Sequence, residues 1–478
     1  MITTKEVCQP VTRPARVHRL WPVLLGLLLA APAVPAHAAS KSKASLPPEI
    51  LRFIHDKEAQ ARSLAQKLEV NVSPDLWAFF RTAQTGTIPA ITNAFERLSK
   101  RARHYEGSPD DPTVSNPIFQ IVIEVILAVG ACSEGDPAYP MAFGKGVIRS
   151  IPPGSIYFGG TDPGRGLITA LSKSHAKGDP FFTISQNALT DGRYLEYLRV
   201  MYGDVLRTPT TNDSATAFSE YLSDAQKRFD HDRMFPAEPR QIKPGEAVKV
   251  IDNHVEVTGQ MAVVGIRALL VKLIFDANSD REFYVEESFP LEWMNPCLVP
   301  HEWIFKLNRK PVESLTEEMV RKDREFWMRQ QTQVIGAWLT PDTPVTDVCA
   351  FALKTFGRKE FSGFKGDRRF IDNAYAVRLY SKLRSSIGGI YNWRASNSRS
   401  PGDQKRMLAE ADFAFRQSFA LCPYSPETVF RYVNLLQSAE RIDDALRVGE
   451  TARSIDPENG QFANLVTELT RSKREKNR

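Results

Sequence analysis

Residues 154–165 have the sequence GSIYFGGTDPGR, and this stretch is the clearest indication of the fold. Its first part, 155–158, has the length and apolar character of a buried strand, and the glycines and proline after it are typical of a tight turn into a helix. A second strand is expected at 181–185 and a second helix at 191–202. Strand, helix, strand and helix in such short order predict parallel strands with right-handed crossovers.

The same alternation extends over residues 111–310. Here the pattern predicts helices at 118–129, 141–149, 166–175 and 261–275, a β-hairpin at 248–257, and strands at 282–286 and 303–307. The expected fold class is α/β with helical flanks. A Rossmann-like domain with a parallel or mixed sheet would lie between an N-terminal helical segment and a C-terminal array of tetratricopeptide-like helical hairpins.

Helices are predicted on both flanks. In the N-terminal segment, 47–106, they are expected at 48–68, from Pro74 after the capping residue Ser73, and at 89–105. In the connecting segment, 312–372, Ser314-Leu315-Thr316-Glu317 has the pattern of a capping box that opens a helix to about Gly336. A further helix is expected at 346–356, followed by a loop at 361–369.

Residues 373–470 are expected to form two helical hairpins, because Pro423 and Pro457 are separated by 34 residues, one period of such a repeat. Helices are expected at 373–394, 407–421, 426–437, 442–455 and 461–469. The pattern resembles the tetratricopeptide repeat, to which these positions fit: Gly388, Tyr391, Ala411, Phe415, Ser418 and Pro423, then Ala445, Ala452 and Pro457. The second copy departs from it at Leu436 and Gly449, and the first needs an insertion of about eleven residues around 396–404.

A broader resemblance covers most of the chain. Residues 154–165, 185–191 with Tyr194, 283–288 and 293–294 resemble the soluble half of an uncharacterised family of large bacterial envelope proteins. In that family a multi-helix membrane half, similar to protein O-mannosyltransferases, precedes an α/β region and tetratricopeptide repeats. This chain has no multi-helix membrane half, so the resemblance implies no transferase chemistry here.

Residues 1–38 have the three parts of a secretory signal. Arg13, Arg16 and Arg19 precede an apolar stretch at 20–34, and Ala36-His37-Ala38 offers a cleavage site. We expect cleavage after Ala38 and an exported protein of the periplasm or cell envelope; the alternative is an uncleaved anchor. Four cysteines then remain: Cys132, Cys297, Cys349 and Cys422. They could form two disulfides or stay as buried free thiols.

Composition excludes several classes of protein. The 478 residues are 42% hydrophobic and 25% charged, as in a globular protein. Most of the +6 net charge belongs to residues 1–38 and the basic tail 471–478, which leaves the rest close to neutral, so we do not expect nucleic-acid binding. Beyond the signal, no apolar run is long enough for a transmembrane domain.

The candidate ligand site is the edge of the sheet at which parallel strands end, because turns and helix starts converge there. Its residues come from the loops after three strands: Gly160, Thr161, Asp162 and Arg165, then Asn187, then Glu286. Glycines allow close backbone approach, and a helix start with an arginine favours an anionic or sugar ligand. The alternative is structural: the first loop is also what a strand-to-helix turn requires, with Asp162 capping one helix and Asn187 or Thr190 the next.

No complete catalytic motif accompanies these residues. The chain has no GxGxxG or GxxxxGK loop, no GxSxG elbow, and no second histidine after His301-Glu302 at helical spacing. Neither a cofactor nor a metal is expected, because the histidines and cysteines are scattered. Trp293, Trp303 and Trp327 are expected to be core residues rather than a sugar platform.

Two functions fit this sequence. The first is an exported, non-enzymatic interaction or scaffold protein whose repeats bind a protein or peptide partner. The second is an envelope glycan or glycoconjugate enzyme, or its accessory subunit, that uses the sheet edge. They differ in whether Asp162, Asn187 and Glu286 meet around an open pocket, and we favour the first.

Overall fold

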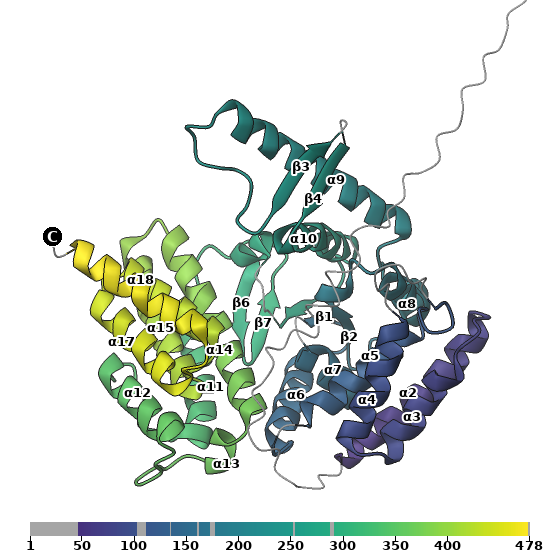
Figure 1. Ribbon diagram of the computed structural model, residues 1–478, viewed down its shortest axis with the longest axis horizontal. Helices are drawn as coiled ribbons and strands as arrows, with labels where there is room; N and C mark the ends of the chain where they lie inside the picture. Colours follow the sequence, from purple (N-terminus) through teal and green to yellow (C-terminus); the bar gives the residue numbers. More distant parts are fainter. Residues whose placement is uncertain are drawn as a thin grey trace, which may run out of the picture.

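The computed structural model describes residues 46–102, 111–133, 135–159, 162–172, 177–251, 254–286 and 291–476 (Figure 1). Helices surround a five-stranded sheet, and a two-stranded hairpin stands apart from it. The protein is therefore a mixed α/β protein, as predicted. The signal peptide predicted at 1–38 lies outside the described residues.

The N-terminal helices pack on one very apolar helix. They are α2 (Pro48–Lys67), α3 (Pro74–Thr85) and α4 (Ile88–Arg101), and all three contact α5 (Phe119–Ala131). As predicted, α3 begins after Ser73, whose hydroxyl accepts from the Asp75 backbone N–H at 3.4 Å. The helix predicted at 89–105 ends at Arg101, and residues 103–110 lie outside the described part of the chain.

A buried ion pair ties these helices together. Lys57 Nζ on α2 lies 2.7 Å from Glu124 Oε2 on α5, and both side chains are almost fully buried. Tyr197 on α8 (Gly192–Tyr202) donates its hydroxyl to Glu124 Oε1 at 3.0 Å. Because an isolated buried carboxylate is costly, this cluster requires the three helices to pack together.

The five-stranded sheet has the order β2-β1-β5-β7-β6. Its strands are β1 (Ile156–Gly159), β2 (Phe182–Ser185), β5 (Phe283–Val285), β6 (Leu298–His301) and β7 (Ile304–Leu307). Strands β2, β1 and β5 are parallel, whereas β7 and β6 are antiparallel to their neighbours. The sheet is therefore mixed, one of the two arrangements expected. Helices α6 (Ala138–Ser150) and α7 (Asp162–Leu171) pack on each other beside it.

The sequence analysis missed strand β6, the short helix α13 (Arg368–Ile371), which begins inside the loop expected at 361–369, and the long helix α9 (Thr211–Met234). Thr210 and Asp213 form a capping box at its start, in which Asp213 N–H donates to Thr210 Oγ1 at 3.1 Å and Thr210 N–H to Asp213 Oδ2 at 2.7 Å. The helix is polar on most of its surface, so hydrophobic periodicity is a weak signal for it.

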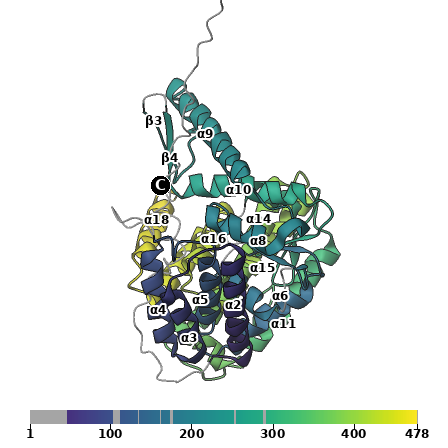
Figure 2. The same ribbon diagram turned by 90° about the vertical axis from the view of Figure 1, so that its right-hand side faces the viewer.

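Helix α9 belongs to an arm that projects from the body (Figures 1 and 2). The arm also contains β3 (Ala247–Ile251), β4 (His254–Thr258) and the start of α10 (Gln260–Ala277). It has a small core of its own, made of Tyr221, Ala225, Val248, Val257, Ala262 and Ile266. Glu246 is buried below this core and accepts hydrogen bonds from Tyr221 and Arg228, each at 2.6 Å. The hairpin predicted at 248–257 is thus present, although residues 252 and 253 at its turn are outside the description.

The connecting helices lead from the sheet to the C-terminal array. They are α11 (Glu317–Ile335), α12 (Val345–Ala352), the π-helical turn η5 (Leu353–Gly357) and α13 (Arg368–Ile371). The capping residue of α11 is Thr316 rather than Ser314, since the Thr316 hydroxyl accepts from the Met319 N–H at 3.2 Å. That bond reaches the third residue of the helix, which is the usual partner of a capping threonine.

The C-terminal helices follow one another as an array, each packed on the next (green to yellow in Figure 1). They are α14 (Ala374–Asn397), α15 (Pro401–Leu421), α16 (Pro426–Ser438), α17 (Ile442–Ile455) and α18 (Gly460–Lys476). The insertion expected around 396–404 forms only a short connection, at residues 398–400. It lengthens α14 to 24 residues and α15 to 21, because the extra turns of both helices can pack against each other.

Aromatic rings join the sheet to this array. Trp303 beside β7 lies 5.4 Å from Trp327 on α11 and 4.9 Å from Tyr380 on α14, measured between ring centroids. Both tryptophans are buried core residues, as predicted, whereas Trp293 is only partly buried. The four cysteines are buried free thiols, and burial raises the pKa of Cys132 to about 12. Within the described ranges, no helix is both long and apolar enough to cross a membrane.

Acid should weaken the contact between α6 and the segment before α13. Tyr139 on α6 donates its hydroxyl to Asp367 Oδ2 at 2.5 Å. Burial alone would raise the pKa of Asp367, but hydrogen bonds from Arg369 and Tyr139 hold it below its ordinary value. A carboxyl with a lowered folded-state pKa stabilises the protein above its unfolded-state pKa, and this stabilisation is lost as the pH falls.

We therefore expect the stability advantage of the native protein over Asp367→Asn to shrink between about pH 5 and about pH 3. Urea unfolding of both proteins at the two pH values measures it. Identical pH dependence of the two proteins would contradict this role of Asp367.

Candidate functional site

The edge where β1, β2 and β5 end has the topology of a ligand site. From β1 the chain passes through α7 to β2 on one side, and it returns much later to β5 on the other side of β1. At such a change of direction, the loops that follow the neighbouring strands run to opposite sides and leave a crevice at the strand ends. Open α/β sheets bind their ligands in this crevice. In the register, Gly159 lies beside Ser185 and Phe158 beside Val285, so the loops after the three strands start side by side.

Glu286 follows β5 at this edge and is fully buried. Its Oε2 accepts a hydrogen bond from the Tyr157 hydroxyl at 2.8 Å, and its backbone N–H donates to the Phe158 carbonyl at 2.9 Å. Burial, and next to it the negative charge of Glu286, raises the pKa of Tyr157 well above its ordinary value. Tyr157 is therefore protonated at neutral pH and acts as a hydrogen-bond donor, which ties β5 to β1.

Asn187 lies in the short turn η2 (Gln186–Ala188) after β2. Its Oδ1 accepts a hydrogen bond from Nη1 of Arg267, a nearly buried residue of α10. The expectation that Asn187 or Thr190 caps the next helix is wrong. Asp191 caps α8, because its Oδ1 accepts from the Arg193 N–H at 2.9 Å and lies at the spacing that a cap requires.

Two tyrosines of α8 cover the outer edge of β2. The Ser185 N–H donates to the Tyr194 hydroxyl at 2.7 Å, and the Tyr202 hydroxyl donates to the Thr183 carbonyl at 2.5 Å. These bonds satisfy backbone groups that an edge strand otherwise leaves open. Tyr194 thus has a structural role.

The other predicted residues of this site cannot be placed in the same detail. Gly160 and Thr161 lie outside the described residues. Asp162 and Arg165 belong to helix α7, and their side chains are outside the description. That they meet Asn187 and Glu286 around a ligand remains a prediction.

Two residues of this edge were missed by the sequence analysis. Tyr157 was assigned only to a strand, and no local signal shows that its hydroxyl meets Glu286. Arg267 does have a signal: it is a single arginine in the apolar run 261–271. A charged side chain at a buried position of such a helix requires a polar partner.

Two cavities among the described residues lie away from this edge. One of about 470 Å³ is formed by the connecting segment, and one of about 210 Å³ lies between Pro296, Trp393 and Met407; neither is lined by a residue of the sheet edge. Among the residues that the structure describes, no group of three or more His, Cys, Asp and Glu side chains could hold a metal ion. At the described part of the sheet edge, Glu286 is buried and bonded to Tyr157, and the partly buried Asn187 is bonded to Arg267.

Comparison with protein-family models, curated proteins and solved structures gives no significant match.

Proposed function

We propose that this protein is an exported, non-enzymatic interaction protein of the cell envelope whose C-terminal helices bind a protein or peptide partner. The observation that carries the proposal is the exposed side of α16, beside helices that are covered. Helix α12 packs on both α15 and α17, and α11 packs on α15, so the face of these second helices is covered. Of the first helices, α14 also packs on α6 and α13 as well as on α16, so the open part of this face is α16, on which Asn434 and Gln437 are exposed.

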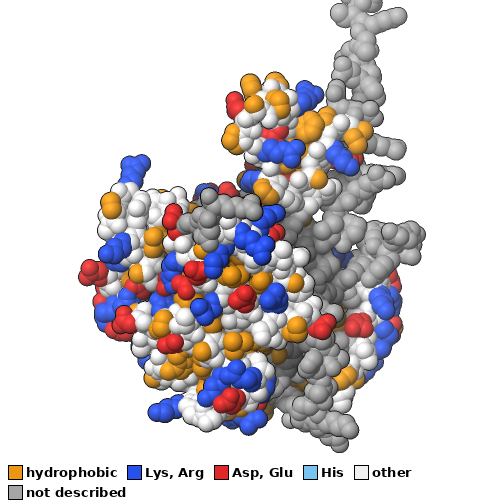
Figure 3. Space-filling view, turned by 60° about the vertical axis from the view of Figure 1, so that its left-hand side comes forward, with side chains coloured by type: hydrophobic (Ala, Val, Ile, Leu, Met, Phe, Trp, Pro, Cys, Tyr) orange, Lys and Arg blue, Asp and Glu red, His pale blue; other side chains and the backbone are white. Residues whose placement is uncertain are grey.

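The surface between α14 and α16 is polar. Arg431 on α16 pairs with Glu427 at 3.0 Å and reaches the Ser386 hydroxyl of α14 at 3.5 Å. Asn434, one turn further along α16, is exposed, and Lys382 of α14 is half-exposed. Such a surface suits an extended peptide, because arginine, lysine and asparagine side chains can bond to its backbone and carboxylates. Figure 3 looks onto the side of the molecule where the C-terminal helices lie and shows basic, acidic and apolar side chains intermixed.

The tetratricopeptide-like assignment of this array is part of the proposal. It is supported by the close approach of α14 and α15 at Gly388, where an added Cβ would lie 3.1 Å from the Phe415 ring. Ala411 and Ala445, which the pattern places between helices, are both fully buried. Export is supported by the signal-like residues 1–38. The sheet edge supports the alternative enzyme function less well, because Glu286 is buried and bonded to Tyr157 rather than open to a substrate.

Site-specific crosslinking in the producing cell tests this function. A photo-crosslinking amino acid at Asn434 should give one discrete adduct outside the cytoplasm, and Arg431→Ala should reduce its yield several-fold. The matched control is the same crosslinker at Gln333, an exposed position of α11 on the covered side of the array. Equal adducts from both positions, or none from Asn434, would contradict the assigned binding face.

A further inference from the structure

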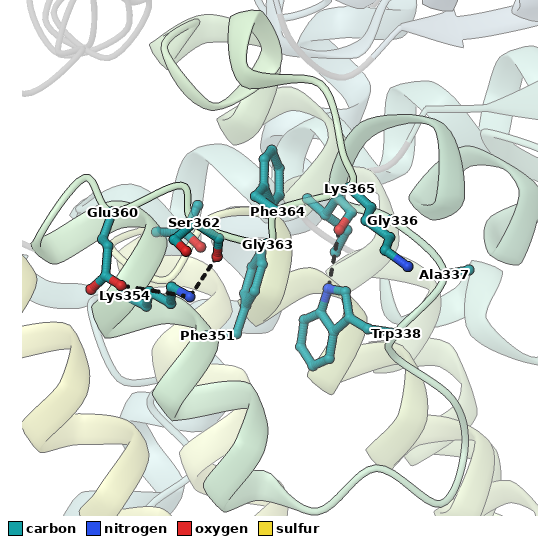
Figure 4. A pocket seen from close by; sticks show the side chains of 12 residues that line it. Gly336, Ala337, Trp338, Phe351, Lys354, Glu360, Ser362, Gly363, Phe364 and Lys365 are labelled. Carbon is teal, nitrogen blue, oxygen red and sulfur yellow. Dashed lines mark hydrogen bonds and ion pairs between the residues drawn. The ribbon is translucent and has the colours of Figure 1, made fainter.

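The connecting segment forms a hollow with aromatic walls. Its cavity of about 470 Å³ lies between the end of α11, the turn η5 and the loop 360–365 (Figure 4). Trp338, Phe351 and Phe364 line it as a row of rings, with centroid distances of 4.4 Å and 6.2 Å between neighbours. All three side chains are only partly buried. Partly exposed rings around a cavity of this size are typical of a binding site rather than of core packing.

Local bonds hold the walls in place. The Trp338 indole N–H donates to the Ile335 carbonyl at 3.1 Å, so the ring rather than the N–H is presented to the hollow. Lys354 Nζ donates to the Ser362 carbonyl at 2.7 Å and lies 3.7 Å from Glu360, as the dashed lines in Figure 4 show. The loop turns at Gly363, whose φ of +72° favours glycine, and Phe364 N–H closes the turn on the Phe361 carbonyl at 3.1 Å.

The charged side chains that line the hollow are Lys354, Lys365 and Glu360, which leaves an excess of one positive charge. The basic side chains further along the segment are paired: Lys359 and Arg368 with Asp372 at 3.8 Å and 3.6 Å, and Arg369 with Asp367 at 3.1 Å. Glu360 is shared between Lys354 and Arg358, at 3.7 Å and 3.6 Å. Lys365 lines the cavity, is exposed and forms no ion pair with any described residue. An excess of positive charge at a cavity mouth attracts and orients an acidic partner.

We infer that this hollow binds an acidic peptide segment that inserts a bulky apolar side chain between Trp338, Phe351 and Phe364. The rings bury the apolar side chain, and Lys365 pairs with a flanking carboxylate. A sugar would need several fixed donors and acceptors inside the cavity, whereas the amine of Lys354 is already bonded to Ser362 and Glu360. The site contains none of the residues assigned above to the α14–α16 surface, so the two proposals can fail separately.

Fluorescence anisotropy with labelled peptides and the mature full chain tests the inference. The probe is Asp-Glu-Phe-Leu-Asp-Glu; one control peptide carries Ser-Ser in place of Phe-Leu, and another carries Lys-Arg in place of each Asp-Glu. Only the probe should bind, and its affinity should fall as salt is raised from about 50 to 300 mM, since screening weakens its pairing with the rim.

Two variants locate the binding. Lys365→Glu should weaken the probe about fivefold or more at low salt, because it reverses an exposed charge at the mouth. Phe364→Ala should also weaken binding of the probe, because it removes one of the three rings that line the hollow. Lys405→Glu, the same reversal at an exposed lysine of α15, should leave affinity unchanged. Lys365→Glu alters only a surface side chain, so it decides the test even if Phe364→Ala loosens the loop.

Several results would overturn the inference. One is absence of probe binding at millimolar concentration. Another is equal binding of the Ser-Ser peptide, which would show that charge alone, and not the aromatic rings, determines binding. Equal effects of Lys365→Glu and Lys405→Glu would place the binding elsewhere. Tighter binding of an acidic oligosaccharide, such as tetragalacturonate, than of the probe would assign the hollow to glycans instead.

Discussion

Replacing Asp323 by alanine should lower the free energy of unfolding by about 3–5 kcal/mol, because it removes one partner of a buried ion pair. Asp323 Oδ2 on α11 lies 2.7 Å from Arg384 Nη1 on α14, and both side chains are almost fully buried. Tyr391 donates its hydroxyl to the same oxygen at 2.8 Å. Without the carboxylate, the Arg384 cation would remain in the core with its charge uncompensated.

The loss should extend beyond this pair because the bonds continue into α15. Arg384 Nε donates to Gln417 Oε1 at 2.7 Å, and Gln417 donates in turn to Gln331 on α11 at 2.8 Å. The guanidinium also lies over the Trp327 ring, 5.4 Å from its centroid. Helices α11, α14 and α15 are therefore joined by one connected polar network, whose members polarise and orient one another.

Chemical denaturation with Glu325→Ala as the control measures this effect. Glu325 is on the same helix and pairs with Arg321 at 2.6 Å, but both side chains are half-exposed, so its loss should cost less than about 1 kcal/mol. The double variant Asp323→Ala with Arg384→Met should recover part of the stability, since it also removes the stranded charge. If Asp323→Ala and Glu325→Ala lowered the free energy of unfolding by the same amount, burial would not explain the contribution of the Asp323–Arg384 pair to stability.

Gly166→Ala should be the second most damaging change, at about 1–3 kcal/mol from overpacking. Gly166 is on α7 at its closest approach to α5, where an added Cβ would lie 2.7 Å from the carbonyl carbon of Leu127 and 2.8 Å from the backbone nitrogen of Ala128. Backbone atoms cannot rotate away as a side chain can, so the two helices would have to separate. The shift would also displace the helix that follows β1 at the candidate site.

Gly130→Ala on α5 is the matched control. An added Cβ there meets nothing within 4 Å, so the substitution should stabilise the protein by up to about 1 kcal/mol through helix propensity alone. Thermal and urea unfolding of the two variants should therefore shift in opposite directions. A stabilising effect of Gly166→Ala would show that α5 and α7 do not approach this closely in solution.

Much of the secondary structure was predictable because its signals are local. Ser73 before Pro74 marks a helix start through its own side chain, and the apolar run 156–158 marks a strand through its own burial. Where local signals are weak the prediction failed, as for the polar helix α9 and the short strand β6.

The candidate site was predictable only in outline. That Asn187 and Glu286 follow neighbouring strands can be inferred from the sequence, because parallel strands end at one edge. Their partners cannot be inferred: Glu286 meets Tyr157 across 129 positions of the chain, and Asn187 meets Arg267 across 80. The aromatic hollow was missed in the same way, because the rings of Trp338 and Phe364 come together only when the loop folds back on α12 and η5.

The sequence by itself thus determined where most helices and strands lie, since capping residues, apolar runs and glycine turns act over a few positions. Only the tertiary structure decided that β5 lies beside β1 with β7 and β6 beyond it, that Glu286 is closed off by Tyr157, and that Asp323 meets Arg384 across 61 positions. These contacts depend on the closure of long loops and on the packing of the whole chain. No local preference of the residues involved specifies them.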